Sequence, residues 1–139
     1  ARRGAVRRDQ EMEEAGIAGD GAYNPTLTPL GFQSEPRNLW EAPNVYLDMS
    51  PFFRADKLSG ALLLYHSLED QNVGTHPMSS TRMLHALQGL GKTAALYMYP
   101  YEDHSVGTYQ TRLDQWARWF AWFDVYVKNR KKETKALQP

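Results

Sequence analysis

The 139-residue sequence contains no cysteine, carries no net charge and has no long apolar run. Without cysteine, the chain has no disulfide, no thiolate-based zinc site and no cysteine nucleophile, whatever its compartment. Sixteen basic and sixteen acidic residues balance, so no overall field favours nucleic acids or acidic lipids. The longest apolar stretches, such as residues 61–65, fall far short of the roughly 18 residues that span a bilayer. We therefore expect no nucleic-acid partner and no membrane partner.

Two charged ends flank a single expected core. Residues 1–15 begin with alanine and carry arginines followed directly by acids, so we expect a solvated arm that is frayed or weakly helical. Residues 131–139 form a charged tail that we expect to fray. The stretch between them, residues 16–130, suits one hydrophobic core. From the charged opening without methionine, we expect the chain to be a fragment.

The first half of residues 16–130 is rich in residues that break regular structure. Glycine, proline and asparagine are dense in residues 16–36, which predicts a loop that packs on the surface through its large apolar side chains. Residues 37–42 are expected to form one or two helical turns, with Leu39 and Trp40 facing inward, until Pro43 stops them. A short irregular region is expected from there to Pro51.

The middle of the chain predicts a β-α-β unit. Residues 61–66 are apolar without alternation, as in a parallel strand that is covered on both faces. Apolar residues at helical spacing within residues 78–90 predict a helix, which Gly89 and Gly91 can end. Residues 93–99 predict a second strand. The fold class is therefore α/β, with parallel strands joined by a crossover helix.

Residues 109–129 predict a long amphipathic helix that packs back on the sheet. Further aromatic side chains widen its apolar face beyond a narrow seam, which indicates either burial on two sides or a partner surface. Packing in the core is favoured over an aromatic ligand site. The stripe expected to be buried consists of Tyr109, Leu113, Trp116, Phe120, Phe123 and Val127.

The chemistry-bearing side chains follow the two predicted strands. Asp70 comes after the first strand, and His104 comes after the second. Functional residues of open parallel sheets collect at the carboxyl ends of the strands. If these strands are neighbours, about 4.8 Å apart, the Asp70 carboxylate can reach the His104 imidazole. A carboxylate that orients an imidazole is two-thirds of an acyl-transfer triad.

Several segments occur in the same order in one enzyme family. They are residues 21–33, 39–42, 49–52 and 56–57, together with the His-x-x-x-Asp-x-Asn pattern of residues 66–72. From residue 21 to about 129, the chain resembles the carboxyl-terminal part of serine peptidases of the prolyl oligopeptidase family, closest to glutamyl-endopeptidase-like and bacterial members. The resemblance implies the carboxyl-terminal portion of an α/β-hydrolase fold, with a partial parallel sheet and a long C-terminal helix. It makes residues 16–130 a partial peptidase catalytic domain, with Asp70 as triad acid and His104 as triad histidine.

The nucleophile that the resemblance implies is missing from the sequence. In this fold the serine lies in a G-x-S-x-G turn upstream of the acid and the histidine, and none of the serines here lies in such a turn. The oxyanion-hole donors and the family's β-propeller would also lie upstream, and residues 2–15 resemble nothing in the family. Where the family has glycine, this chain has Ser67 and Ser105, which cost about 1 kcal/mol or more if the backbone there is left-handed.

The leading hypothesis is a serine-type peptidase fragment that carries the triad Asp70 and His104 but is inactive by itself. The complete enzyme would take a peptide substrate and need no cofactor. One alternative is a non-catalytic remnant or interaction module that self-associates through an exposed sheet edge. Another is a fragment of a small-ester hydrolase, which would use the same acid and histidine.

The remaining histidines and acids predict no metal centre. His66, Glu69, Asp70 and His104 lack the spacing of a metal motif such as H-E-x-x-H. We expect His66 to be a half-buried structural residue at a strand end. His76 and His85 are expected to face solvent, and Asn72 is expected to orient its loop.

Overall fold

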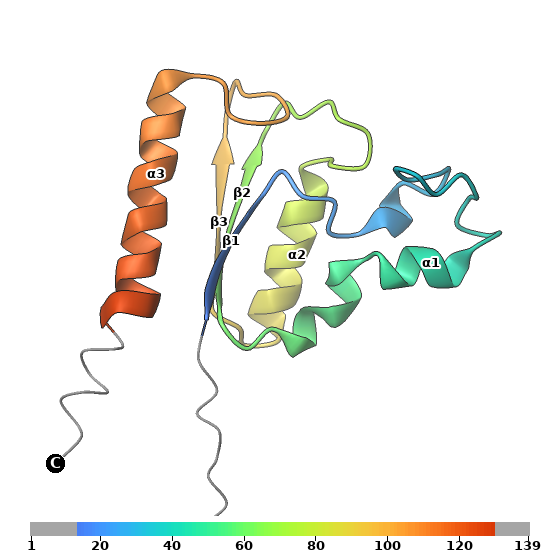
Figure 1. Cartoon of the computed structure of the whole chain (residues 1–139), viewed down its shortest axis with the longest axis horizontal. Coiled ribbons are helices and arrows are strands. Elements are labelled where there is room, and N and C mark those ends of the chain that lie inside the picture. The colour runs from blue at the N-terminus through green and yellow to red at the C-terminus, as the bar shows by residue number, and fades with distance from the viewer. Residues whose placement is uncertain (1–13, 130–139) are drawn as a thin grey trace, which may run out of the picture.

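The computed structural model of the protein describes residues 14–129, in which helices flank a three-stranded parallel sheet of order β1-β2-β3 (Figure 1). Helix α3 lies on one side of the sheet, and α1 and α2 lie on the other. The expectations for the charged arm up to residue 13 and for the tail fall outside the described residues. The strands and α-helices are β1 (Ala15–Gly19), α1 (Pro43–Asp48), β2 (Ala61–Ser67), α2 (Met78–Gly89), β3 (Ala94–Tyr99) and α3 (Tyr109–Phe123). Short 3₁₀ helices cover Pro25–Leu27 and Pro51–Lys57, and a π-helical segment, Asp124–Asn129, continues α3.

The predicted β-α-β unit is confirmed. Strands β2 and β3 pair in parallel, with His66 opposite Met98, and α2 connects them. Gly91, with φ of 69°, adopts the left-handed conformation that commonly follows a helix end. Its N–H donates to the Gln88 carbonyl, and the Lys92 N–H donates to the Leu87 carbonyl. These bonds satisfy carbonyls that the helix leaves free in its last turn.

The loop predicted for residues 16–36 is wrong at its start, because β1 lies there. Strand β1 pairs in parallel with β2, with Gly19 opposite Tyr65. Glycine is depleted in strands, so composition favoured a loop. Here glycine has a packing role: a Cβ on Gly19 would lie 1.8 Å from Cζ of the Tyr65 ring. The absence of a side chain lets the tyrosine cover this end of β1.

Residues 43–57 are largely helical where an irregular region was predicted, and residues 37–42 form a turn where a helix was predicted. Pro43 begins α1 instead of ending a helix, and Pro51 likewise begins a 3₁₀ helix. Proline is tolerated in the first turn because its missing N–H would have no partner there. The inward orientation predicted for Trp40 is also wrong, since this side chain is 74% exposed. Asn38 Oδ1 accepts the N–H groups of Trp40 and Glu41, which closes a turn in place of the expected helix.

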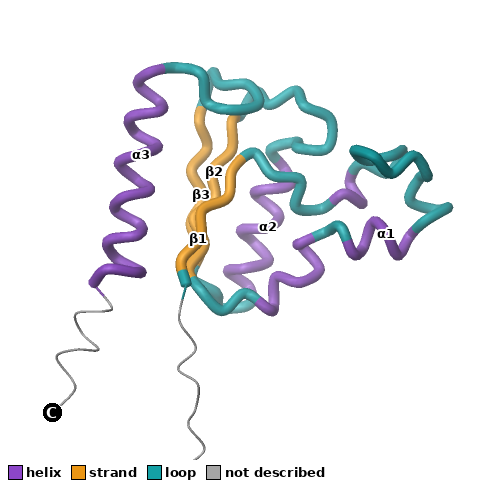
Figure 2. The backbone as a smooth tube through the Cα atoms, in the orientation of Figure 1, coloured by secondary structure: helices purple, strands orange, loops and turns teal. Residues whose placement is uncertain are grey.

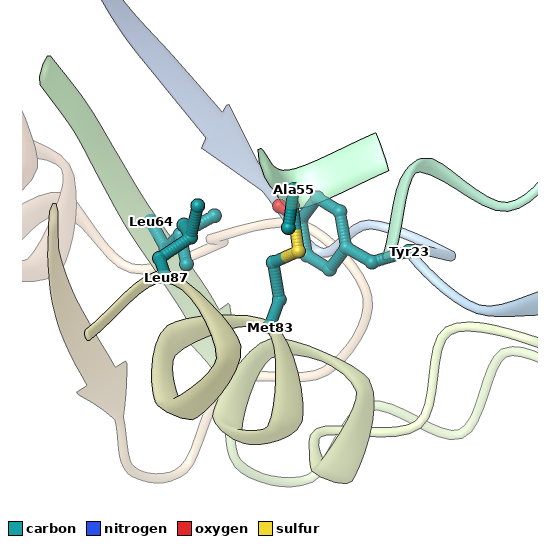
Figure 3. Close-up of a cluster of buried hydrophobic side chains, with 5 residues drawn as sticks. All are labelled: Tyr23, Ala55, Leu64, Met83 and Leu87. Carbon is teal, nitrogen blue, oxygen red and sulfur yellow. The ribbon is translucent and has the colours of Figure 1, made fainter. Parts of the chain in front are cut away.

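The hydrophobic core lies between β2 and α2. Alternate residues of a strand point to opposite faces of the sheet, and residues four apart in a helix share one face. Leu64 of β2 therefore meets Met83 and Leu87 of α2, and Tyr23 and Ala55 complete the buried cluster (Figure 3). This packing holds α2 against β2, the strand that precedes Asp70.

The C-terminal helix is present, but the side predicted to be buried is wrong. Large side chains of the expected stripe are exposed: Tyr109 71%, Leu113 47%, Trp116 53%, Phe120 70% and Phe123 38%. Another side of the helix meets the sheet. The Trp119 ring lies 5.8 Å from the Tyr65 ring, and the Arg118 guanidinium lies 3.8 Å over the Tyr97 ring. Tyrosines on this face of the sheet therefore favour the side of α3 that can offer them polar and aromatic partners.

Within residues 14–129, no helix combines the length and the apolar character needed to pass through a bilayer.

Candidate catalytic site

Two loops meet beyond the carboxyl ends of β2 and β3 (Figure 2). Because the strands are hydrogen-bonded neighbours, the loops leave the sheet side by side. Backbone hydrogen bonds then join them: the Leu68 N–H donates to the Tyr99 carbonyl at 2.8 Å, and the Glu69 N–H donates to the Glu102 carbonyl at 3.1 Å. The sheet and these bonds together fix one loop against the other.

The structure brings Asp70 and His104 together at this edge. Oδ2 of Asp70 lies 3.0 Å from Nδ1 of His104. The Asp70 side chain is fully buried, whereas the His104 side chain is 40% exposed. On the other carboxylate oxygen, Asp70 Oδ1 accepts the Asn72 N–H at 2.8 Å. The backbone at residue 72 thus helps to orient the Asp70 carboxylate, and His104 is the member of the pair that solvent can reach.

The hydrogen-bond partners of His104 assign its tautomer. Nδ1 faces a carboxylate and therefore carries the proton, while Nε2 lies 3.3 Å from Nδ2 of Asn72, which can only donate. The bond to Asp70 outweighs partial desolvation and raises the pKa of His104. Burial acts to raise the pKa of Asp70, but bonds from His104 and from the Asn72 backbone prevail and lower it. The pair therefore keeps a charged acid beside an imidazole of enhanced basicity.

A second histidine also contacts the acid. His66, expected to be half-buried, is fully buried, with Nε2 3.1 Å from Asp70 Oδ2 and Nδ1 2.5 Å from Ser80 Oγ. Asp20, at the end of β1, accepts the Ser67 N–H at 2.7 Å and places its Oδ1 3.9 Å from His66 Nε2. Neither Asp20 nor Ser80 was predicted from the sequence to lie at the site. The loop interpretation of residues 16–36 removed Asp20 from consideration, although a carboxylate after a recognised third strand would have been a candidate.

Three of these side chains could approach one metal ion. Donor atoms of Asp20, His66 and Asp70 all lie within 4.8 Å of one another. Each of the three already bonds to protein groups, however, through the contacts described above. Glu69, considered as a ligand from the sequence, is exposed and lies outside this group. His76 and His85 are exposed, as predicted.

The two serines that replace family glycines differ in conformation. Ser105 has φ of 75°, in the left-handed region, where a residue other than glycine carries a conformational cost. Ser67 is absent from the positive-φ residues and ends β2. Its Oγ is buried and has no hydrogen-bond partner among residues 14–129, which carries a desolvation cost instead.

Glu102 holds the His104 loop in shape. Tyr101, with φ of 60°, and Ser105 both adopt left-handed backbone conformations around it. The Glu102 carboxylate accepts the Thr108 hydroxyl and the Gly107 N–H, the latter at 2.7 Å. Such strained residues persist only where neighbouring interactions over-determine them. The Thr108 hydroxyl and the Gly107 N–H lower the pKa of Glu102 from 4.5 to about 2.

Replacing Glu102 by glutamine is expected to lower the free energy of unfolding at pH 7 by about 1–3 kcal/mol, because charge-assisted bonds weaken. The folded pKa lies below the unfolded one, so the carboxylate's contribution is complete above about pH 4.5. It is lost as the pH falls to about 2, and the difference between wild type and Glu102→Gln should shrink over that window. Urea denaturation across this range measures it. Glu69→Gln, at an exposed acid, is the matched control, and a difference that persists at low pH would contradict the assignment.

The parallel sheet and the acid and histidine on its successive loops correspond to the carboxyl-terminal portion of an α/β-hydrolase fold, as the family match and the solved peptidase below show. The model of the prolyl oligopeptidase family matches residues 5–130, and the chain belongs to this family of serine-peptidase hydrolases. The match starts at residue 5, so the expectation that residues 2–15 have no counterpart in the family is wrong from there on.

Relatives and solved structures agree with this assignment. The chain is 54% identical over 89 residues to a probable glutamyl endopeptidase, chloroplastic, of Arabidopsis thaliana, covering 64% of this chain and 9% of that protein. Its counterpart in Oryza sativa subsp. japonica is 52% identical, covering 64% and 10%. The acylaminoacyl peptidase of Pyrococcus horikoshii superposes with a TM-score of 0.72 at 26% identity, over 82% of this chain and 20% of that one. The chain thus spans about a tenth of the curated relatives and a fifth of this solved peptidase.

Proposed function

We propose that residues 16–130 form the carboxyl-terminal part of a serine peptidase catalytic domain, in which Asp70 is the triad acid and His104 the general base. One observation carries the proposal: the 3.0 Å contact between Asp70 Oδ2 and His104 Nδ1, with the histidine partly exposed. Family membership and the peptidase names of the relatives support peptides as the substrate class.

In the proposed reaction, Nε2 of His104 accepts the proton of a serine hydroxyl while the serine oxygen attacks the peptide carbonyl. The proton passes to the leaving amine as the carbon–nitrogen bond breaks, and water then releases the acyl group by the reverse proton path. Asp70 keeps the ring in the Nδ1–H tautomer and stabilises the imidazolium that forms. In this proposal the attacking serine comes from outside these 139 residues, whose sequence holds no G-x-S-x-G turn.

A fluorophosphonate probe, which reacts with activated serines, tests whether the nucleophile lies outside this chain. The 139-residue chain should remain unlabelled. A chimera in which residues 14–129 replace the matching segment of the Arabidopsis relative should be labelled and should hydrolyse peptides. Stoichiometric labelling of the chain alone would show that it has its own nucleophile. A folded chimera that hydrolyses small esters but no peptides would favour the esterase alternative.

The interaction-module alternative stays a prediction. In residues 14–129 the sheet ends at β1 on one side and at β3 on the other, and either edge offers backbone groups to another strand.

A further inference from the structure

We propose that His66 is a positioning residue for the acid of the proposed triad, donating its Nε2–H to the same oxygen of Asp70 that receives the His104 proton donor. The inference rests on the proposed function for its catalytic meaning, but its geometry stands independently. It assigns a role to a buried titratable group that the proposed mechanism does not use.

The contact between His66 and Asp70 is important because both side chains are shielded from water. The side chains of His66 and Asp70 are both 0% exposed, and Ser80, whose hydroxyl contacts Nδ1 of His66, is also fully buried. A carboxylate removed from water requires hydrogen-bond donors from the protein. Asp70 Oδ1 has the Asn72 N–H, whereas Oδ2 lies between two imidazoles, 3.1 Å from His66 Nε2 and 3.0 Å from His104 Nδ1.

The surroundings of the His66 ring determine which nitrogen carries the proton. Nε2 faces carboxylate oxygens of Asp70 at 3.1 Å and of Asp20 at 3.9 Å, so a lone pair there would be repelled from both. On the opposite side of the ring, the Ser80 hydroxyl can donate to Nδ1 over 2.5 Å. These partners therefore place a proton on Nε2 of His66.

Sharing one oxygen couples the two histidines. A hydrogen bond from His66 draws electron density from Oδ2 and so weakens the attraction of Asp70 for the proton on His104. It also opposes rotation of the carboxylate away from His104. The other charged groups that act on His104 are Asp20, at the end of β1, and Asp103, in its own loop. Neither of these acids can replace a donor on Oδ2, because a carboxylate only accepts.

Proton-detected NMR of the ¹⁵N-labelled 139-residue chain tests the assignment without requiring activity. Long-range ¹H–¹⁵N correlations report which ring nitrogen of each histidine is protonated. We expect the Nε2–H tautomer for His66, with a downfield proton signal from its bond to a carboxylate. The Nδ1–H tautomer at His66 would overturn the proposal.

Four variants separate donation from packing. His66→Leu removes the donor, and the pKa of His104 should rise above its wild-type value. His66→Gln can place an amide N–H near the position of Nε2, and should return the pKa of His104 towards wild type. Ser80→Ala removes the partner of Nδ1, and should weaken the downfield His66 signal while leaving α2 intact. His85→Gln, at an exposed histidine of the same helix, is the control.

The outcomes distinguish this inference from the proposed function. If His66→Leu and His66→Gln change the His104 pKa equally or not at all, His66 is only a packed core residue. If His66→Leu does not fold, the wild-type spectrum decides: a His66 Nε2–H signal without the downfield shift of a bond to a carboxylate leads to the same conclusion. Should these titrations behave as expected while a folded chimera stays unlabelled by the fluorophosphonate, the peptidase role fails and the positioning of Asp70 stands.

Discussion

Asp70→Asn and His104→Ala should each lower kcat/KM of the chimeric peptidase by about 10⁴-fold. Asparagine fits the space of the acid, but its amide cannot stabilise an imidazolium and favours the wrong histidine tautomer. Alanine at position 104 removes the proton acceptor itself. A loss of this size corresponds to about 5.5 kcal/mol of transition-state stabilisation. Steady-state hydrolysis of a peptide substrate measures it.

Two matched substitutions control for general damage to the site. Glu69→Gln neutralises an exposed acid in the same loop as Asp70, and His85→Gln removes an exposed histidine from α2. Both should retain kcat/KM within about twofold, since neither side chain contacts the pair. Because the triad members act together, the double variant Asp70→Asn/His104→Ala should be little worse than either single change. Near-normal turnover in either single variant would reject the roles assigned to these residues.

The part of the fold that surrounds the site was predictable because several signals agree there. An unbroken apolar run identifies β2, helical spacing identifies α2, and Gly91 marks the end of that helix. Parallel pairing of β2 with β3 then places the following loops together, which is why Asp70 and His104 could be paired from the sequence. Their spatial contact follows from topology and needs no detail of side-chain packing.

Features that depend on packing between distant segments were not predictable in the same way. Gly19 looks like a turn residue unless one knows that the Tyr65 ring lies over it. The side of α3 that faces the sheet depends on Tyr97 and Tyr99, whose partners Arg118 and Asp114 are polar. An apolar stripe alone therefore chose the wrong side of the helix. The full burial of His66 could not be predicted either, because it depends on α2 and on the residue after β1 packing against the end of β2.

A substitution in the hydrophobic core near Asp70 should also have a large effect, in this case on stability. Leu64 is fully buried on the central strand, two residues before His66 and against Met83 and Leu87. Leu64→Ala should lower the free energy of unfolding by about 2–5 kcal/mol, from lost burial and from the cavity that remains. Urea denaturation of the 139-residue chain measures the loss. Leu30→Ala, at a leucine 82% exposed, should stay within about 0.5 kcal/mol of wild type.

The same change should also reach the site. A small domain has only about 5–15 kcal/mol of stability, so the loss at Leu64 is a large share of the total. The Leu64 side chain joins β2 to α2, and α2 carries the Ser80 hydroxyl that contacts His66. Weaker packing between β2 and α2 should broaden the His66 Nε2–H signal before global unfolding. Leu30→Ala should leave this signal sharp. A sharp signal in Leu64→Ala would contradict this coupling. It would mean that the loops after β2 and β3 maintain the contact between His66 and Asp70 without support from the core.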